Sequence, residues 1–270
     1  MSNKVLIFAH FHSRGLLRDD TVRLLSEAVV YFKSIFFVST NILDEELKKL
    51  HPSIIYCKRD NYGYDFYSYR EGLLRAGVGD VRKNDIDLCC LMNSSVLCID
   101  ARKFWSKVFA RSFRDDVLYG LTRSFQITEH IQSYLLIFGR KIFRNEAFLN
   151  WWVDMQPISI KEQVVLQCEL GFSSKVKELG YRCEPIFEHS VKMPAAVLGL
   201  SSKYRKIFAG VINRSMSPTT FHWRNLYEEY SIIKVDLLKN NDDDMDLRPL
   251  LEMASNSADL VQGLNQAFEN

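Results

Sequence analysis

The chain has 270 residues, of which 47% are hydrophobic, 13% aromatic and 25% charged, a balance typical of a folded globular protein. This composition argues against a disordered, collagen-like or low-complexity chain. Lys and Arg number 35 against 33 Asp and Glu, so the net charge of +2 gives no broad basic surface and argues against nucleic acid as the partner.

Apolar runs alternate with helix-like patterns through most of the chain. In the first half, we expect strands over 5–11, 35–39, 54–57 and 88–92, and helices over 19–33, 43–50, 64–76 and 102–110. In the second half, we expect strands over 117–122, 134–138 and 182–187, and helices over 145–155 and 161–179. This alternation predicts an α/β fold with a mostly parallel sheet flanked by helices.

The run Asn240-Asn241-Asp242-Asp243-Asp244-Met245-Asp246 breaks this pattern. A calcium loop would need a glycine turn and a distal Glu at a fixed offset, so we interpret the run as a solvated turn before a last amphipathic helix. The interpretation divides the chain into a domain over residues 1–240 and a C-terminal helical tail over residues 241–270.

No apolar run reaches the ~18–20 residues that a membrane-spanning helix needs, and residues 5–9 are too short for a signal-peptide core. The six cysteines form neither a CxxC motif nor a zinc-ligand spacing, and adjacent Cys89 and Cys90 should face opposite sides of a strand. We expect reduced thiols and a cytoplasmic protein, and we leave open peripheral attachment at the inner face of the cytoplasmic membrane.

The first expected strand ends in Ala9-His10-Phe11-His12. Ligands of open α/β sheets bind at the carboxyl ends of strands, so both histidines are candidates for ligand contact. The alternative is that one histidine caps the strand end and the other is solvated, and the sequence does not decide between them.

Asn61-Tyr62-Gly63-Tyr64-Asp65 joins the third expected strand to a helix. Asn and Gly favour a turn, and Asp65 falls in the first helical turn, where a carboxylate can cap the helix. It can also accept hydrogen bonds from a ribose or a base. Capping alone needs no flanking aromatic residues, so we favour a binding loop.

Asn93-Ser94-Ser95 follows the fourth expected strand, at a position suited to a phosphate or a metal ion. None of these three residues is anionic, although hard divalent cations prefer carboxylate oxygens. The alternative is a tight turn capped by Asn and Ser.

His130, Gln132 and Tyr134 alternate, so in extended backbone they would share one face, an arrangement suited to a polyol such as a sugar. Each could equally be a satisfied interior polar group. Trp151 and Trp152 lie on an expected helix, where one could form a stacking wall for a sugar ring; core packing is the preferred interpretation for both.

Glu169 lies among apolar residues on a helix that later presents Val176 and Leu179 inward. A buried carboxylate has a raised pKa and can act as a general base. The alternative is a Glu at the helix N-terminus or on the surface, paired with a nearby Lys.

Taken in order over residues 4–240, a series of motifs resembles the rhamnan synthesis protein F family of bacterial polysaccharide glycosyltransferases. The series comprises 5–11, 61–66 with Tyr69 and Gly72-Leu73, 91–96, 119–122, 130–134, Trp151-Trp152, 169–173, 217–219, Trp223 and Ile233-Lys234 before Leu237-Leu238. The resemblance implies a GT-A-like Rossmann-type mixed, mostly parallel sheet over residues 1–240.

The resemblance also implies a nucleotide-sugar donor, with dTDP-rhamnose as the expected compound. The residues implied to bind the donor are Ala9, His10, Phe11, Asn61, Gly63, Asp65, Asn93, Ser94 and Ser95. Ser94 stands where the family more often has Asp. We therefore assign no metal ligand, and a divalent cation remains an open question.

Glu169 resembles the catalytic base of inverting GT-A enzymes, and Leu179-Gly180-Tyr181 matches the end of their base-bearing helix. The residues implied to contact the sugar or the acceptor are His130, Gln132, Ser133 and Trp151. The expected protein is an inverting rhamnosyltransferase that extends a glycan or lipid-linked glycan of O-antigen or rhamnan type. The alternative is a catalytically silent nucleotide-sugar-binding module that assists a partner glycosyltransferase.

Overall fold

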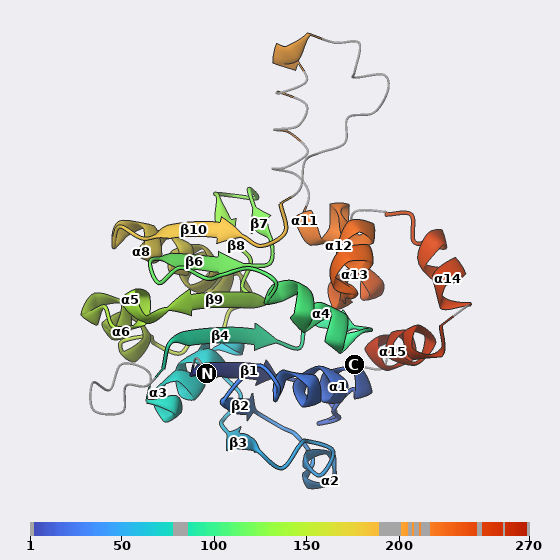
Figure 1. Ribbon diagram of the computed structural model, residues 1–270, viewed down its shortest axis with the longest axis horizontal. Coiled ribbons are helices and arrows are strands. Elements are labelled where there is room, and N and C mark those ends of the chain that lie inside the picture. The colour runs from blue at the N-terminus through green and yellow to red at the C-terminus, as the bar shows by residue number, and fades with distance from the viewer. Residues whose placement is uncertain are drawn as a thin grey trace.

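A mixed sheet occupies the centre of the protein. The computed structural model describes residues 3–77, 86–188, 201–204, 207, 211, 217–241, 245–255 and 257–268. Within them, seven strands form one sheet in the order β10-β6-β9-β4-β1-β2-β3 (Figure 1). These strands are β1 (Lys4–His10), β2 (Ser34–Ser39), β3 (Ile54–Lys58), β4 (Leu88–Asn93), β6 (Val117–Gly120), β9 (Leu135–Gly139) and β10 (Arg182–Pro185).

Most neighbouring strands run parallel, which confirms the predicted mixed, mostly parallel α/β sheet. β1 pairs in parallel with β2 and β4, β2 with β3, and β6 with β10. β9 is antiparallel to both β4 and β6. This reversal places Leu135, the first residue of β9, opposite Met92 near the end of β4. The turn before β9 therefore lies at the edge where β4 ends.

Helices cover both faces of the sheet because its buried strands are apolar on both sides. One face packs against α1 (Asp19–Ala28), α4 (Ala101–Val108) and α12 (Trp223–Tyr230), and the other against α3 (Tyr64–Ala76), α6 (Glu146–Val153) and α8 (Gly171–Glu178). Cys90 faces the first core and Cys89 the second, as strand alternation predicts. All six cysteines are free thiols.

The C-terminal helices form a third core against a short two-stranded sheet. That sheet pairs β5 (Val96–Cys98) with β11 (Ile232–Lys234). This small sheet contacts α13 (Val235–Lys239) and α15 (Ala258–Phe268), and α14 (Arg248–Ala254) packs in the same hydrophobic cluster. Figure 1 shows these helices together, coloured orange to red. The expected tail is thus two helices that dock on the same body. Asn241 has a φ of 44°, and its side chain bonds the backbone of Met245, so a turn begins there; residues 242–244 lie outside the described residues.

The expected helix over 161–179 is interrupted. α7 (Lys161–Val164) leads into the π-helix η1 (Val165–Leu170), which continues as α8. A π-helical turn takes i→i+5 hydrogen bonds, and such segments are frequent at functional sites. The expected helix over 19–33 also ends earlier, at Ala28.

The expected extended run through His130, Gln132 and Tyr134 is wrong. β7 (Arg123–Ser124) pairs with β8 (His130–Ile131), and a turn at Ser133 and Tyr134 then leads into β9. The remaining short helices are α2 (Asp44–Leu47), α5 (Arg140–Phe143) and α11 (Pro218–Phe221). None of the helices in the described part of the chain is long and apolar enough to cross a membrane.

Candidate active site

A cavity of about 600 Å³ opens where β1, β3 and β4 end. It brings together seven of the nine residues expected to bind a donor: His10, Phe11, Asn61, Gly63, Asp65, Ser94 and Ser95. The other two, Ala9 and Asn93, are buried next to it as paired positions of β1 and β4. Further lining comes from Thr40, Arg59, Tyr62, Tyr64, Ser68, Ser159, Val235, Asp236 and Lys239.

The loop before α3 forms one wall of this cavity, and Arg59 holds its shape. The buried guanidinium donates to the carbonyl oxygens of Asp60, Tyr62 and Tyr64. It also donates to the Ser68 hydroxyl at 2.8 Å. Arg59 is therefore committed to the loop rather than to a ligand. The structure thus identifies Arg59 as the residue that stabilises the loop before α3, a role that the sequence pattern did not indicate.

Gly63 allows the loop to enter α3. Its φ of +69° is in the left-handed region, and a Cβ there would come within 2.7 Å of the Tyr67 ring. Because of this backbone conformation and this close approach, a residue with a side chain could replace Gly63 only if the loop rearranged.

Asp65 reaches across from α3 to the end of β4 instead of capping its own helix. Its Oδ2 accepts a 2.7 Å hydrogen bond from Asn93 Nδ2. Burial raises the pKa of the Asp65 carboxyl to about 6, against the opposing charges of Lys234 and Arg59 and with a contribution from the Glu169 carboxylate. Asp65 therefore lies within electrostatic range of both Lys234 and Glu169.

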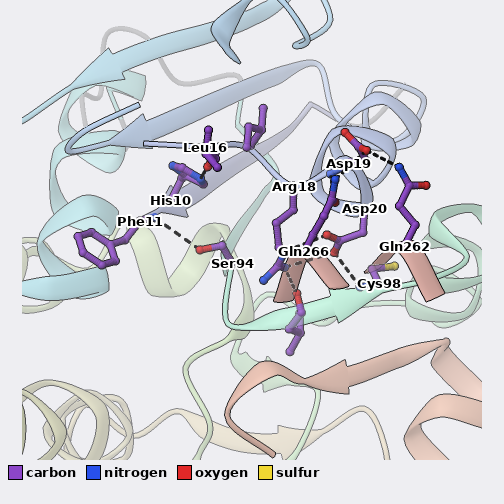
Figure 2. Close-up of polar contacts among 12 residues, drawn as sticks. His10, Phe11, Leu16, Arg18, Asp19, Asp20, Ser94, Cys98, Gln262 and Gln266 are labelled. Carbon is purple, nitrogen blue, oxygen red and sulfur yellow. Dashed lines mark hydrogen bonds and ion pairs between the residues drawn. The ribbon is translucent and has the colours of Figure 1, made fainter. Parts of the chain in front are cut away.

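Asn93, Ser94 and Ser95 form a tight turn, which was one of the two interpretations of this motif. Asn93 Oδ1 accepts from the Ser95 backbone N–H at 3.1 Å and from its hydroxyl at 2.5 Å. The Ser94 hydroxyl lies 3.5 Å from the Phe11 backbone nitrogen (Figure 2). The turn places Ser94 and Ser95 on the cavity wall, so the same residues form a tight turn and line the cavity.

His10 is held in one neutral tautomer. Its Nε2 lies 3.1 Å from the Leu16 carbonyl oxygen, which can only accept, so Nε2 carries the proton (Figure 2). Nδ1 then accepts from the Ser39 hydroxyl at 2.9 Å. Burial lowers the pKa of His10 to about 3, with a further contribution from His12. Both ring nitrogens are therefore used to fix the end of β1, and His12 is also buried rather than solvated.

The turn before β9 connects the cavity region to Glu169. The Ser133 backbone N–H and hydroxyl donate to Glu169 Oε1 at 2.9 and 3.1 Å. The Tyr69 hydroxyl donates to the Ser133 carbonyl at 2.9 Å, and the Asn93 N–H reaches the Tyr134 carbonyl at 3.3 Å. Glu169 lies in the π-helix η1 and is half-buried. Its partner is thus this turn, in place of the Lys that a surface Glu would be expected to contact.

Lys234 was part of the family motif series but had no expected role. Its Nζ donates to Ser95 Oγ at 2.8 Å and lies 5.1 Å from the centre of the Tyr134 ring. The contact joins residues 139 positions apart, so no local sequence pattern could have indicated it.

The expected sugar-contacting residues do not all gather at this site. Gln132 bonds the hydroxyls of Thr122 and Ser217, whereas His130 Nδ1 bonds the Thr128 carbonyl within its own hairpin. Trp151 lines a second cavity of about 570 Å³ between α6 and η1. Trp152 packs in the core, as expected.

A buried ion pair holds β5, the strand that follows Ser95. Arg18 and Asp20 make two contacts at 2.9 and 3.3 Å. Arg18 Nη2 also donates to the Val96 carbonyl at 2.6 Å, and the Cys98 N–H donates to Asp20 at 3.0 Å (Figure 2). The start of α1 is thereby tied to the strand beside the cavity turn.

The site defines a class of protein. A cavity at the carboxyl ends of parallel strands, lined by aromatic rings and a few converging polar groups, is typical of α/β proteins that bind small molecules. The chain belongs to the family described as rhamnan synthesis protein F, whose sequence model matches residues 35–245. This match confirms the family resemblance predicted from the motif series.

Individual relatives are distant. The chain is 24% identical over 195 residues to the uncharacterized protein y4gN of Sinorhizobium fredii, covering 69% of this chain and 49% of that protein. It therefore spans about half the length of that relative. It is 26% identical over 272 residues to the virulence protein VirA of Vibrio anguillarum, covering 93% and 84%. The solved glycosyltransferase GlyE of Streptococcus pneumoniae TIGR4 shares 13% identity at a TM-score of 0.46, covering 100% of this chain and 64% of that one.

Proposed function

We propose that this protein is an inverting glycosyltransferase of GT-A-like architecture that transfers rhamnose from dTDP-rhamnose to a glycan. The family description, rhamnan synthesis, supports rhamnose as the transferred sugar. A cavity of about 600 Å³ is of the size that small-molecule ligands and cofactors occupy. The nucleotide would lie against His10, Asn61 and Gly63, and the diphosphate beside Ser94 and Ser95.

The observation that carries the proposal is the hydrogen-bonded placement of Glu169 by the turn before β9. Ser133 fixes Oε1 through two hydrogen bonds, so the carboxylate has a defined orientation near Asp65. In the proposed step, an acceptor hydroxyl oxygen attacks the anomeric carbon while the bond from that carbon to the diphosphate oxygen breaks. Glu169 takes the hydroxyl proton as general base.

The test is Glu169→Gln, which keeps the shape of the side chain but removes its basicity. We expect donor binding to be retained and transfer to fall by about 10²–10⁴-fold, the usual contribution of a general base. Glu178→Gln, an exposed change on the adjoining α8, is the matched control and should leave transfer unchanged. Transfer at the wild-type rate by Glu169→Gln would remove the proposed role.

The acceptor side of the proposal rests on what surrounds Ser133. Ser133 bonds the base, and Ser133 and the preceding Gln132 would contact the reacting sugar. His130 and Trp151 lie on separate elements and would contact more distant units of a glycan or lipid-linked glycan. Transfer to a lipid-linked acceptor would take place at the inner face of the cytoplasmic membrane, with the protein bound peripherally to that membrane or to a partner enzyme.

A second candidate is a catalytically silent nucleotide-sugar-binding module that assists a partner glycosyltransferase. The neutral Ser94 at the cavity turn favours it, since a decayed transferase could retain the cavity and lose the chemistry. Calorimetry with a panel of nucleotide-sugars that includes dTDP-rhamnose, followed by a transfer assay on the same protein, separates the two. Binding with transfer supports the enzyme, whereas binding without transfer supports the module.

A further inference from the structure

The cavity turn does not offer the ligands that a divalent cation prefers. Asn93 donates through Nδ2 to Asp65, and its Oδ1 accepts two hydrogen bonds from Ser95. Ser94 and Ser95 contribute neutral hydroxyls. Among the described residues, no three His, Cys, Asp or Glu side chains gather as a metal site. The described residues of the cavity lining include two carboxylates, Asp65 and Asp236, of which Asp65 is engaged by Asn93. Hard cations favour several carboxylate oxygens, so the residues of the turn do not fit a resident metal ion.

A positive charge of the protein already lies at this turn. Lys234 Nζ donates to Ser95 Oγ at 2.8 Å, and the ring of Tyr134 lies beneath the ammonium group at 5.1 Å. Backbone contacts hold the lysine in register, because Val235 N–H donates to the Ser95 carbonyl at 3.0 Å. Val235 and Asp236, the next two residues, line the cavity. Lys234 is therefore held beside the cavity turn by its own side chain and by the backbone of the next residue, Val235.

Other cations near the cavity are placed differently. Arg59 is engaged with loop carbonyls, and Arg70 donates to the carbonyl oxygens of Trp152 and Val153. Lys239 lines the cavity but lies at the far end of α13 from Ser95. Within the described part of the chain, Lys234 directly contacts the turn that would face a diphosphate, through Ser95 Oγ.

We propose that Lys234 takes the place of a divalent cation and binds the diphosphate of the donor at Ser95, so that this protein needs no metal ion. This inference rests on the proposed glycosyltransferase function. As the bond from the anomeric carbon breaks, its electron pair passes to the diphosphate oxygen, and the ammonium group stabilises the charge that develops there. The acceptor proton goes to Glu169, so the step balances without a further reactant.

The experiment compares the binding of dTDP, UDP, GDP and thymidine by calorimetry, in EDTA and in Mn²⁺. We expect wild-type protein to bind one of the diphosphates equally well in both conditions. Lys234→Met should weaken that binding by roughly tenfold to a hundredfold, the range for a lost charge-assisted hydrogen bond, and leave thymidine binding unchanged. Lys234→Arg should restore most of the affinity. Lys58→Met, an exposed lysine outside the cavity, is the control.

Three results would overturn the inference. Loss of wild-type diphosphate binding in EDTA with recovery in Mn²⁺ would show that a metal ion is required, and the glycosyltransferase proposal would survive. Equal loss of diphosphate and thymidine binding in Lys234→Met would show that Lys234 supports the structure of the cavity and does not bind the diphosphate. Absence of all nucleotide binding by wild-type protein, with or without Mn²⁺, would refute the proposed function and this inference together.

Discussion

The buried Arg18–Asp20 pair gives the sharpest test of how the cavity turn is supported. Side-chain exposure is 5% for Arg18 and 0% for Asp20, so Asp20→Ala leaves a guanidinium in the interior without its counter-charge. Breaking such a pair costs about 3–5 kcal/mol in the free energy of unfolding. For a protein of this length, each kcal/mol lowers the melting temperature by about 2 °C, so a drop of about 6–10 °C is expected.

The assay is urea unfolding followed by fluorescence, together with a thermal scan. Asp116→Ala is a matched control, because Arg114 and Asp116 form a pair with the same spacing and exposures of 61% and 36%. Its cost should stay below about 1 kcal/mol. The double variant Arg18→Met/Asp20→Leu removes both charges and should be more stable than Asp20→Ala by at least about 1 kcal/mol.

Two results would refute this reasoning. A cost below about 1 kcal/mol for Asp20→Ala would show that the buried pair adds no more than an exposed one. A double variant whose loss of stability equals the sum of the losses of Arg18→Met and Asp20→Leu, each measured alone, would show that the charges do not act as a pair.

Three further predictions follow from the fold and the site. Gly120→Ala adds a Cβ that overlaps Ile131 and comes within 2.9 Å of the Leu135 carbonyl oxygen, so urea unfolding should show a loss of about 1–3 kcal/mol. Because the pKa of His10 is lowered from 6.5 to about 3, the unfolded chain binds the additional proton between these values, and this histidine removes stability as the pH falls through that range. In urea titrations at a series of pH values, the free energy of unfolding should therefore fall less steeply with decreasing pH for His10→Asn than for wild type. The difference in slope should be about 1.4 kcal/mol per pH unit. Because the pKa of Asp65 is raised from 3.8 to about 6, its ionisation removes stability as the pH rises through that range. Asp65→Asn should raise the melting temperature at pH 7 while weakening nucleotide binding in calorimetry; a lower melting temperature would contradict this.

The parts of the fold that depend on local pattern were predictable. Strand positions follow from runs such as 88–92, in which every residue is buried. The place of the cavity follows from the rule that ligands lie at the carboxyl ends of strands. Seven of nine expected donor residues line the cavity for this reason. Their role in binding remains a prediction.

The parts that depend on distant contacts were not predictable. Lys234 meets Ser95 across 139 positions. The π-helical turn that carries Glu169 lies within a run that the apolar pattern predicts as one helix over 161–179. The expected face through His130, Gln132 and Tyr134 failed because the chain turns at Ser133, where backbone and side chain bond Glu169. Periodicity reports which residues are buried, and it does not report which partners they meet.

The contact between α15 and Asp19 joins two segments that the ribosome synthesises at widely separated times. Gln262 and Gln266 bond the Asp19 carboxylate, and the Gln266 contact spans 247 positions (Figure 2). At about 5–20 residues per second, a ribosome completes α15 about 10–50 s after Asp19. Closing so long a loop costs only about 0.6 kcal/mol more per doubling of its length. The length of the loop therefore matters mainly for timing, because Leu97 of the apolar strand β5 lacks its contact with α15 until that helix has been synthesised.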